Sequence, residues 1–483
     1  MTSFLKRAFT ILCGTVFLAA CGNGAPGDIA EKSRLENLPR LQQNLMDLRF
    51  GMFIHYNMPT YSDQDWPDPD MPVSAFNPSK LDCGQWADVA RSANMKYGCL
   101  TTKHHSGFCI WDTKTTGYNV MNSPLKRDIV REYVDAFRSR GLRTMLYYSI
   151  LDTHHGIRPG WIDRGDVEMI KAQLTELLSN YGPIDALVID GWDAWWSRIS
   201  YEEIPFEEIY NHIKSLQPDC LVSEHNAGKY PDSELFYSDF KQYEQAAGQL
   251  VSRDTNQVPA QSGLPINKNW FWKESFPSDS VKSAEYIVYN NLIPLNEAHC
   301  NFLLNVAPNR DGLIDDNVVA EFRKIGQLWQ HPGEAPRLTV AKTPVISENL
   351  AKRKPMRSSW SFDTRISDLA ADDDFETYWV AYERVKEPFL EVDLGEPTEI
   401  NAAGFVESDT TEFYNSVKST RIGRYSISYL SDAGWKELPV EPSDAFVRIH
   451  RFPAVKASKV RYDFKDYQPG LAIKEVLVYD EKR

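Results

Sequence analysis

Short apolar runs alternate with helix-patterned segments through the first two-thirds of this 483-residue sequence. The apolar runs have the length of buried strands, and the segments between them repeat apolar residues with a helical period. Such alternation predicts a parallel sheet covered by helices, and at this chain length a (β/α)8-type barrel, which we place at residues 36–336. The predicted strands are residues 52–55, 99–103, 143–149, 186–190 and 221–224, and the predicted helices are residues 83–94, 128–140, 166–181 and 201–217.

Polar side chains stand at the ends of the predicted strands. In a (β/α)8 barrel the carboxyl ends of all the strands meet at one mouth, where the loops build the active site. This mouth is therefore the expected place of catalysis. The residues concerned are His55, Lys103, His104, His105, Ser149, Asp152, Asp190, Glu224 and His225.

His104 and His105 follow Lys103 in the segment TTKHHSGFCIW. Two imidazoles beside a lysine are costly to bury unless they have polar partners. Adjacent side chains of an extended segment point to opposite faces, and a helical zinc motif separates its two histidines by one turn. Three interpretations stay open from the residues alone: a pair that hydrogen-bonds a hydroxylated ligand, a metal site, or a structural pair with internal partners.

The composition argues against one class of partner. A formal net charge of −14 argues against nucleic acid, because phosphates require a basic face. The chain also contains 13 Trp, 23 Tyr and 23 Phe. Most of these must lie in the core, but aromatic rings also pack well against the apolar C–H faces of sugars.

The sequence pattern changes after Trp329. From residue 345 onwards, short alternating segments are separated by Asp, Gly and Pro, which predicts an all-β sandwich at residues 345–483. The stretch DDDFETYW at residues 372–379, with EVDLG at 391–395, resembles the discoidin-type jelly roll of carbohydrate-binding modules. Its Asp cluster is either a Ca²⁺ site or a solvated loop. The domain either binds glycans or only supports the barrel.

The first residues have the pattern of a targeting segment. Lys6 and Arg7 precede an apolar stretch at residues 8–20, which is too short to span a membrane, so residues 1–20 are predicted to be a signal peptide. The sequence LAACG at residues 18–22 resembles a bacterial lipobox, which implies a lipid on Cys21 followed by a flexible tether at residues 21–35. Of the seven cysteines, Cys13 lies in the predicted signal peptide and Cys21 is the predicted lipid site. The other five are odd in number and widely scattered, which argues against a disulfide framework.

An ordered series of motifs over residues 38–329 resembles the catalytic domain of glycoside hydrolase family 29, the retaining α-L-fucosidases. The motifs are RFGMFIH at 49–55, FNP at 76–78, KHH at 103–105, RDIV at 127–130, LVIDG at 187–191 and NFLLNVAP at 301–308. The resemblance implies a retaining exo-α-L-fucosidase that releases terminal L-fucose, with no metal and no organic cofactor.

Retaining glycosidases use one carboxylate as nucleophile and one carboxylic acid as general acid, about 5 to 5.5 Å apart. Asp190 closes a buried strand, where a carboxylate either faces a ligand or caps a helix. The resemblance to the family segment W-x-D-G implies that Asp190 is the nucleophile, although Val188 replaces the usual Trp.

The segment DFKQYE at residues 239–244 resembles the family pattern D-[FY]-x-[ST]-x-E, which implies that Glu244 is the acid/base. Gln242 departs from that pattern. Glu274 is the main competitor, followed by Glu234 and Glu224.

Fucose offers hydroxyl groups and one methyl group, which call for polar partners and an apolar wall. A Ser106 in place of the usual Asp after the paired histidines is a further departure from the family. By family analogy, the predicted substrate contacts are His55, Asp65, Trp66, His104, His105, Tyr148, Trp270 and Trp272.

The predicted partners are fucosylated oligosaccharides or glycoconjugates, with α1,3/1,4-linked fucose favoured and α1,2-linked or plant glycans as alternatives. A non-catalytic fucose-binding lipoprotein is the rival from another class. The predicted location is the bacterial cell envelope, with contact to the membrane only through the lipid on Cys21 and no contact with nucleic acid.

Overall fold

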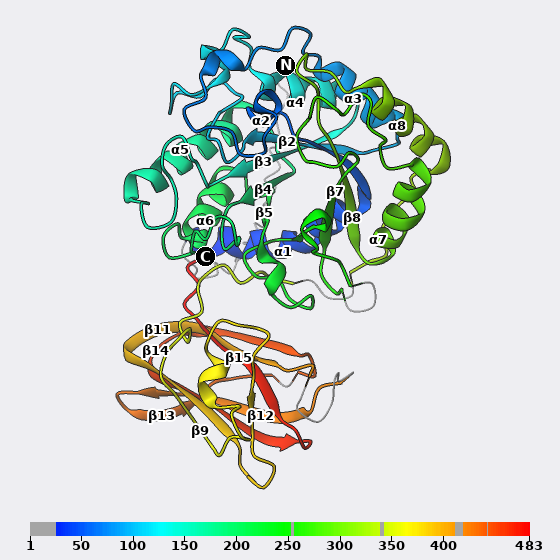
Figure 1. Cartoon of the computed structure of the whole chain (residues 1–483). Helices are drawn as coiled ribbons and strands as arrows, with labels where there is room; N and C mark the ends of the chain where they lie inside the picture. The colour runs from blue at the N-terminus through cyan, green and yellow to red at the C-terminus, as the bar shows by residue number, and fades with distance from the viewer. Residues whose placement is uncertain (1–25, 253–255, 339–341, 411–418, 442) are drawn as a thin grey trace, which may run out of the picture.

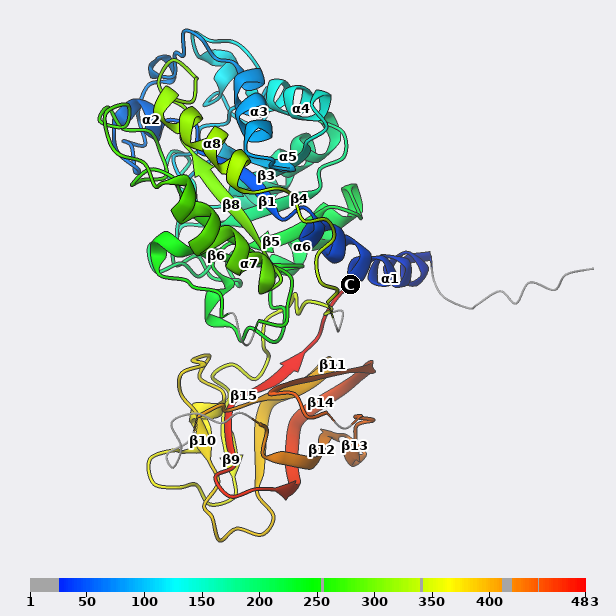
Figure 2. The ribbon, with the colours of Figure 1, turned by 90° about the vertical axis from the view of Figure 1, so that its right-hand side faces the viewer.

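The structure is a computed structural model that describes residues 26–483, apart from 253–255, 339–341, 411–418 and 442. Figures 1 and 2 show a large domain, in which helices surround a barrel of strands, and a smaller β domain beside it. Helix α1 (Pro26–Asp47) covers residues 26–35, so this part of the predicted tether is helical. The predicted signal segment and Cys21 lie outside the described residues.

The barrel is one parallel sheet with the strand order β5-β4-β3-β2-β1-β8-β7-β6. Between β5 and β6 the two edges meet through the hydrogen bond from the Asp239 N–H to the Val222 carbonyl, at 2.7 Å. The predicted (β/α)8-type fold is confirmed. Its strands are β1 (Phe50–Ile54), β2 (Tyr97–Lys103), β3 (Arg143–Ser149), β4 (Ala186–Asp190), β5 (Leu221–Glu224), β6 (Lys241–Glu244), β7 (Ala260–Pro265) and β8 (Cys300–Val306).

Aspartate side chains begin three of the outer helices. Asp82, Asp128 and Asp163 each accept hydrogen bonds from free N–H groups of the first helical turn. One predicted start was too early: the last helix before β5 begins after Pro205, because a proline disfavours helical backbone in the residue before it. The helices are α2 (Pro59–Ser62), α3 (Cys83–Ser92), α4 (Ile129–Ser139), α5 (Arg164–Asn180), α6 (Phe206–Leu216), α7 (Ile293–Glu297) and α8 (Asp316–Leu328).

The two loops that follow β5 and β6 depart from the regular alternation. The first carries the 3₁₀ turn η3 (Ala227–Lys229), and the second carries η4 (Gln245–Ala247) in its described part. The π-helix η5 (Tyr286–Leu292) precedes α7. Short turns in place of helices leave this side of the barrel open to the second domain.

Side chains of the strands alternate between the barrel interior and the helices. In β3, Met145 and Tyr147 belong to the interior cluster, whereas Leu146 and Tyr148 pack in the cluster beneath the helices. Leu45 and other apolar residues of α1 join the interior cluster, so α1 covers the amino-terminal end of the barrel. The opposite, carboxyl end is left for the functional site.

The second domain is an antiparallel β-sandwich, as predicted. Its long strands β11 and β14 are interrupted by register shifts, and Trp379, Phe405 and Tyr462 fill its core. The strand order is β10-β15-β11-β14-β12-β13, with β9 paired to β11. The strands are β9 (Met356–Ser358), β10 (Trp379–Val380), β11 (Phe389–Glu407), β12 (Ile422–Ser431), β13 (Gly434–Glu437), β14 (Val447–Tyr467) and β15 (Ala472–Tyr479).

Apolar residues join the sandwich to the barrel. Phe375 of the sandwich packs against Tyr230 and Phe236 of the barrel, with ring centroids 5.2 and 6.2 Å apart. Val345 and Leu477 belong to the same buried cluster as the helices of the barrel. The core of the barrel therefore continues into the second domain.

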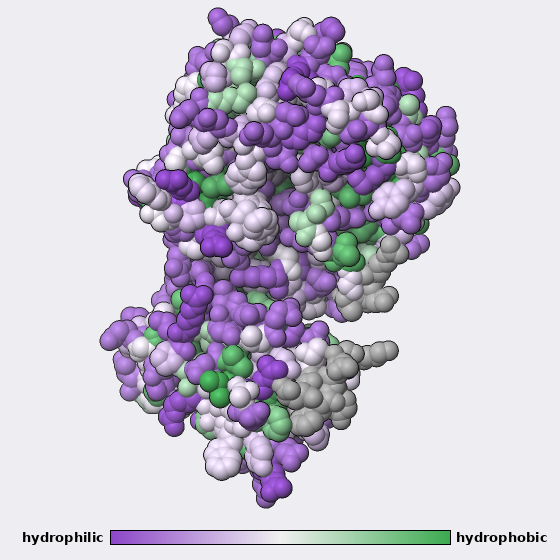
Figure 3. Space-filling model, viewed as in Figure 1, coloured by the Kyte–Doolittle hydropathy of each residue, from purple (hydrophilic) through white to green (hydrophobic). Residues whose placement is uncertain are grey.

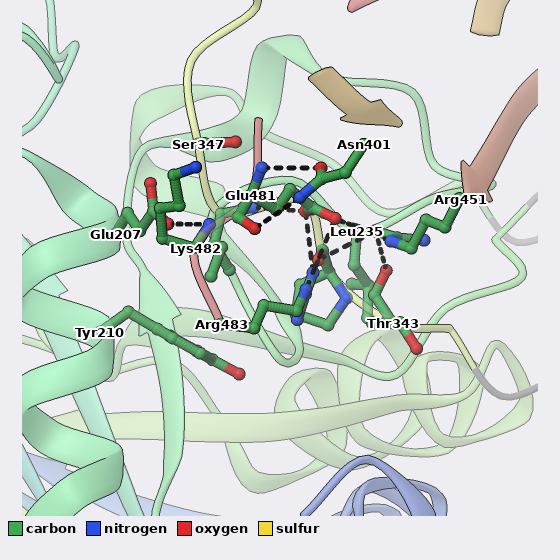
Figure 4. Close-up of polar contacts among 12 residues, drawn as sticks. Glu207, Tyr210, Leu235, Thr343, Ser347, Asn401, Arg451, Glu481, Lys482 and Arg483 are labelled. Atoms are coloured by element: carbon green, nitrogen blue, oxygen red, sulfur yellow. Dashed lines mark hydrogen bonds and ion pairs between the residues drawn. The ribbon is translucent and has the colours of Figure 1, made fainter. Parts of the chain in front are cut away.

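The C-terminal residues return to the barrel and add polar contacts (Figure 4). The Lys482 N–H donates to the Glu207 carboxylate at the start of α6, and the Arg483 guanidinium donates to the Pro344 carbonyl. Arg451 of β14 contacts Glu481 at 2.8 Å. Burial raises the pKa of Glu207 to about 7, with Glu481 adding to the shift. The end of the chain thus fastens the two domains together.

We expect a fragment that ends at Pro336 to be insoluble, because it loses the sandwich and exposes the apolar surface around Tyr230 and Phe236. Soluble yield and size-exclusion chromatography of the fragment, beside the full chain expressed in parallel, give the measurement. A soluble and fully active fragment would show that the barrel folds without this support.

Most of the surface in Figure 3 is hydrophilic, with apolar groups scattered over both domains. In the part of the chain that the structure describes, no helix combines the length and the apolar character needed to cross a membrane. The described cysteines Cys83, Cys99, Cys109, Cys220 and Cys300 are buried free thiols.

Candidate active site

A pocket of about 180 Å³ lies at the carboxyl end of the barrel. It is smaller than the roughly 300 to 1,000 Å³ usual for larger ligands, and its size suits a single sugar unit. The lining residues are Phe53, His55, Asp65, Trp66, His104, His105, Tyr147, Asp190, Trp195, Trp196, His225, Glu244, Trp270 and Phe271.

Asp190 accepts hydrogen bonds from one donor on the neighbouring strand β3 and from one in the segment after β5. The Tyr147 hydroxyl donates to Oδ2 at 2.5 Å, and the Asn226 amide donates to Oδ1 at 2.8 Å. Burial, reinforced by Asp190, raises the pKa of Tyr147 well above its ordinary value, so the phenol keeps its proton. Hydrogen bonds to both oxygens fix the orientation of this carboxyl group.

Glu244 is the last residue of β6, and it lines the same pocket as Asp190. The Trp270 indole N–H donates to Glu244 Oε1 at 2.8 Å, and His225 Nε2 lies 3.5 Å from Oε2. Part of the Glu244 side chain stays accessible. This carboxyl group is therefore oriented but remains open to a ligand.

His225 follows β5 and interacts with both carboxylates. Burial disfavours its charged form, but Asp190, and then the contact with Glu244, outweigh burial and raise the pKa of His225 to about 9. The imidazole thus carries a positive charge at neutral pH. That charge partly balances the two carboxylates of the pocket.

Three further histidines of the pocket are neutral. Burial lowers the pKa of His55, His104 and His105 well below the usual value, and the neighbouring histidines add to the effect. His55 Nδ1 lies 2.7 Å from the Asn305 side-chain oxygen, so Nδ1 donates. Its Nε2 is left as an acceptor, which suits the hydroxyl group of a sugar.

His104 and His105 both line the pocket, contrary to the expectation that they point to opposite faces. Strand β2 ends at Lys103, so the two residues lie in a turn, and their ring centroids are 3.9 Å apart. His105 Nδ1 contacts the Ser149 hydroxyl at 2.8 Å, and Nε2 lies 3.8 Å from Asp190 Oδ2. Turn geometry therefore brings both imidazoles to the predicted place.

Tyr148 does not line the pocket, and Tyr147 takes the predicted position. Tyr148 is fully buried between the strands and the helices, where its hydroxyl donates to Gln173 at 2.6 Å. Lys103 lies over its ring and pairs with Asp152 at 3.2 Å, also outside the pocket. The reason is the two-residue period of a strand, which places Tyr147 and Asp190 on the interior face and Tyr148 on the exterior face.

Trp272 is also displaced from its predicted role. Its indole N–H donates to Asp315 at 2.8 Å, and its ring packs with Phe276 and Ala307 away from the pocket. Phe271 and Trp270 supply the apolar wall instead. The segment after β7 is an irregular loop, so its side-chain directions follow no simple period.

The competing carboxylates lie elsewhere. Glu274 is 67% exposed and paired with Arg310 at 2.6 Å, and Glu234 pairs with Lys342 at 3.1 Å. Glu224 is fully buried behind the pocket, and burial, together with nearby Asp190, raises its pKa well above the ordinary value. Among the four candidates, Glu244 alone lines the pocket with Asp190.

Asp65 and Trp66 reach the pocket from the loop after β1, as predicted. Asp65 pairs with Lys273 at 2.9 Å, and Trp66 stacks on His105 at 4.8 Å between ring centroids. The residues that sequence reasoning did not place in the pocket are Phe53, Tyr147, Trp195, Trp196 and Phe271, together with Asn226 behind Asp190. Strand parity with Asp190 is the signal that points to Tyr147.

Within the described ranges, no group of three or more His, Cys, Asp or Glu side chains has the arrangement of a metal site. In the sandwich, Asp372 accepts hydrogen bonds from the Asp374 N–H at 3.1 Å and the Thr377 hydroxyl at 2.8 Å. The Asp cluster therefore uses part of its oxygen atoms to hold its own loop.

Comparisons with known proteins give a family match for each of the two domains. Residues 60–334 match the family model "Alpha-L-fucosidase", and residues 355–476 match the "F5/8 type C domain". "Alpha-L-fucosidase 1" of Arabidopsis thaliana is 27% identical over 397 residues, which cover 75% of this chain and 72% of that protein. Human "Plasma alpha-L-fucosidase" is 25% identical over 329 residues, which cover 59% of this chain and 67% of that protein.

The structure of "Alpha-L-fucosidase isoenzyme 1 from Paenibacillus thiaminolyticus" shares the fold with a TM-score of 0.52 and 22% identity, covering 93% of this chain and all of that one. The family match spans more than half of the sequence. The chain therefore belongs to the α-L-fucosidase family, glycoside hydrolase family 29, and is a glycoside hydrolase of the α-L-fucosidase type.

Proposed function

We propose that this protein is a retaining exo-α-L-fucosidase in which Asp190 is the nucleophile and Glu244 is the acid/base. The observation that carries the proposal is the unequal treatment of two carboxyl groups in one pocket. Asp190 is buried and receives hydrogen bonds on both oxygens, whereas Glu244 is partly accessible. An ionised nucleophile and a group that exchanges protons with the substrate need these two environments.

In the first step, an Asp190 oxygen attacks the anomeric carbon of fucose, and Glu244 transfers its proton to the departing glycosidic oxygen. The products are a fucosyl-enzyme ester and the free aglycone. In the second step, Glu244 takes a proton from water, whose oxygen attacks the same carbon and releases Asp190. Two inversions restore the α configuration.

His225 supports the change of role of Glu244. With Nε2 at 3.5 Å from Glu244 Oε2, the charged His225 keeps its own proton while the Glu244 carboxyl group gives its proton to the leaving group. After that proton has gone to the leaving group, the imidazolium stabilises the Glu244 carboxylate, which then serves as base. His225 therefore acts as a positioning residue for Glu244.

The remaining pocket residues fit the shape of fucose. Neutral His55, His104 and His105 supply hydrogen-bonding nitrogens for the ring hydroxyls, with Asp65 beside them. The rings of Phe271 and Trp270 provide an apolar surface for the C6 methyl group. A pocket of about 180 Å³ holds one terminal sugar, which supports exo action.

We favour α1,3/1,4-linked fucose as the substrate. The support is the resemblance of the segment WFW at residues 270–272, together with the appended sandwich, to the branch of the family that acts on these linkages. Substrates with α1,2 linkages and plant glycans are the alternatives, and a non-catalytic fucose-binding lipoprotein is the rival class. A panel of defined fucosyl oligosaccharides tests all three. We expect fucose release from α1,3/1,4-linked members at least about tenfold faster than from α1,2-linked ones, a difference of roughly 1.4 kcal/mol.

Equal rates on all linkages would contradict the proposed linkage preference but would still support fucosidase activity. Binding without any release, also from an activated aryl fucoside, would favour the non-catalytic rival.

We also propose that the protein is lipid-anchored in the bacterial cell envelope through Cys21. The support is the sequence alone: the basic Lys6 and Arg7, the apolar residues 8–20, and the lipobox-like residues 18–22. We expect the Cys21→Ser variant to be released from the membrane fraction and the unaltered chain to stay in it. Equal fractionation of the two would contradict the anchor.

A further inference from the structure

Three tryptophans stand at the entrance of the pocket, and we call Trp66, Trp195 and Trp196 the indole rim. Trp195 is 82% exposed, and Trp66 is 46% exposed. The rings of Trp66 and Trp196 meet edge to face at 5.5 Å, and Trp196 also packs on His105 at 4.4 Å. Exposed indoles that gather at one mouth differ from apolar residues scattered singly over a surface.

The segment that carries Trp195 is held in place without using its indole. Trp192 is buried and donates to the Ile204 carbonyl at 2.8 Å, and it is bridged to Ile199. The Arg198 N–H donates to the Ala194 carbonyl at 2.7 Å. The contacts of Trp192 and Arg198 therefore hold this loop in place, and the indole of Trp195 stays exposed to solvent.

Several charged groups around this loop are paired with one another. Lys229 contacts Asp193 at 2.7 Å and Asp373 of the sandwich at 3.3 Å, so the second domain helps to hold the loop. On the other side, Lys273 pairs with Asp65. Because these charges are neutralised locally, the rim offers mainly apolar ring faces to a ligand.

We infer that the indole rim, with Trp195 as its outermost member, is a binding site for the sugar to which fucose is attached. This inference rests on the proposed exo-fucosidase function. The fucosyl unit fills the small pocket, so the adjoining pyranose lies at the entrance, which Trp195 and Trp196 help to line. The ligand class is a neutral oligosaccharide whose next ring turns an apolar C–H face to an indole.

The test compares substrates with and without an adjoining sugar. We expect Trp195→Ala to lower kcat/KM on a fucosyl oligosaccharide by about five- to twentyfold, a loss of the size that aromatic stacking provides. Hydrolysis of α-L-fucosyl fluoride, which has no aglycone ring, should stay within about twofold of the parent. Inhibition by the defucosylated oligosaccharide should weaken together with kcat/KM on the glycan.

Trp161→Ala is the matched control, because Trp161 is also exposed, at 71%, but does not line the pocket. Equal losses on both substrates in Trp195→Ala, or no loss on the oligosaccharide, would overturn the rim assignment. An oligosaccharide-specific loss in Trp161→Ala would overturn it as well. If the parent protein hydrolysed neither substrate, the proposed function itself would fail, and the inference would fall with it.

Discussion

Replacing Asp190 by Ala should lower fucosidase activity by roughly four to six orders of magnitude, as expected for a nucleophile that acts together with its partners. The substitution removes the group that receives hydrogen bonds from Tyr147 and Asn226 at 2.5 and 2.8 Å. Without it, no covalent fucosyl-enzyme can form. The rate on an aryl fucoside, with the thermal unfolding midpoint as a check on folding, is the measurement.

Chemical rescue makes the assignment of Asp190 specific. Azide can occupy the space left by the carboxylate in Asp190→Ala and attack the anomeric carbon directly, so the product should be β-L-fucosyl azide, from a single inversion. In the parent protein, a 2-fluoro fucosyl fluoride should leave a stable label on the peptide that contains Asp190. Glu274→Ala, which removes an exposed carboxylate outside the pocket, is the control and should keep most of the activity.

More than a few per cent of the parent activity in Asp190→Ala would contradict the assignment. A label on another peptide would do the same.

The parallel barrel was predictable because strands and helices leave different periods in the sequence. Five of the eight strands were placed from apolar runs, and the strand ends then pointed to His55, Asp190 and His225 at one mouth. Strand β6 was missed as a strand, because Lys241 and Gln242 interrupt its apolar pattern. Lys241 is nevertheless buried, since it donates to the Tyr230 carbonyl and pairs with Asp232 at 2.6 Å.

The errors in the pocket have two distinct physical origins. Tyr147 and Tyr148 share the same chemistry, and only the face that Asp190 occupies on the neighbouring strand decides between them. That information was present in the sequence as strand parity. The choice of Phe271 over Trp272, and the position of Trp195, depend on irregular loops whose paths are set by distant partners such as Asp315 and Ile204. A single sequence holds no local signal for such contacts.

Glu244→Gln should separate the substrates by their leaving groups. A sugar alkoxide needs a proton in the transition state, whereas a nitrophenolate leaves almost without one, and general acid catalysis contributes roughly 10²- to 10⁴-fold. We therefore expect kcat/KM on fucosyl oligosaccharides to fall by about that factor, with a much smaller fall on an aryl fucoside. The Gln oxygen can still accept the Trp270 N–H, so the loop should keep its position.

The second duty of Glu244 gives an independent signal. Without a base to activate water, the fucosyl-enzyme should accumulate on an aryl substrate and appear as a burst of nitrophenol. Azide needs no base, so it should restore turnover and give α-L-fucosyl azide, the product of two inversions. The α product from this variant and the β product from Asp190→Ala would together fix which carboxylate performs which step.

Glu274→Gln is the matched control for the acid/base assignment, because it alters a glutamate in a neighbouring loop that is bound to Arg310 rather than to the pocket. It should show the same modest change on glycans and on aryl fucosides, without a burst and without rescue by azide. If instead Glu274→Gln depended on the leaving group and Glu244→Gln did not, Glu274 would be the acid. The loop after β7 would then have to move for Glu274 to reach the pocket, because its carboxylate is held by Arg310 at the surface.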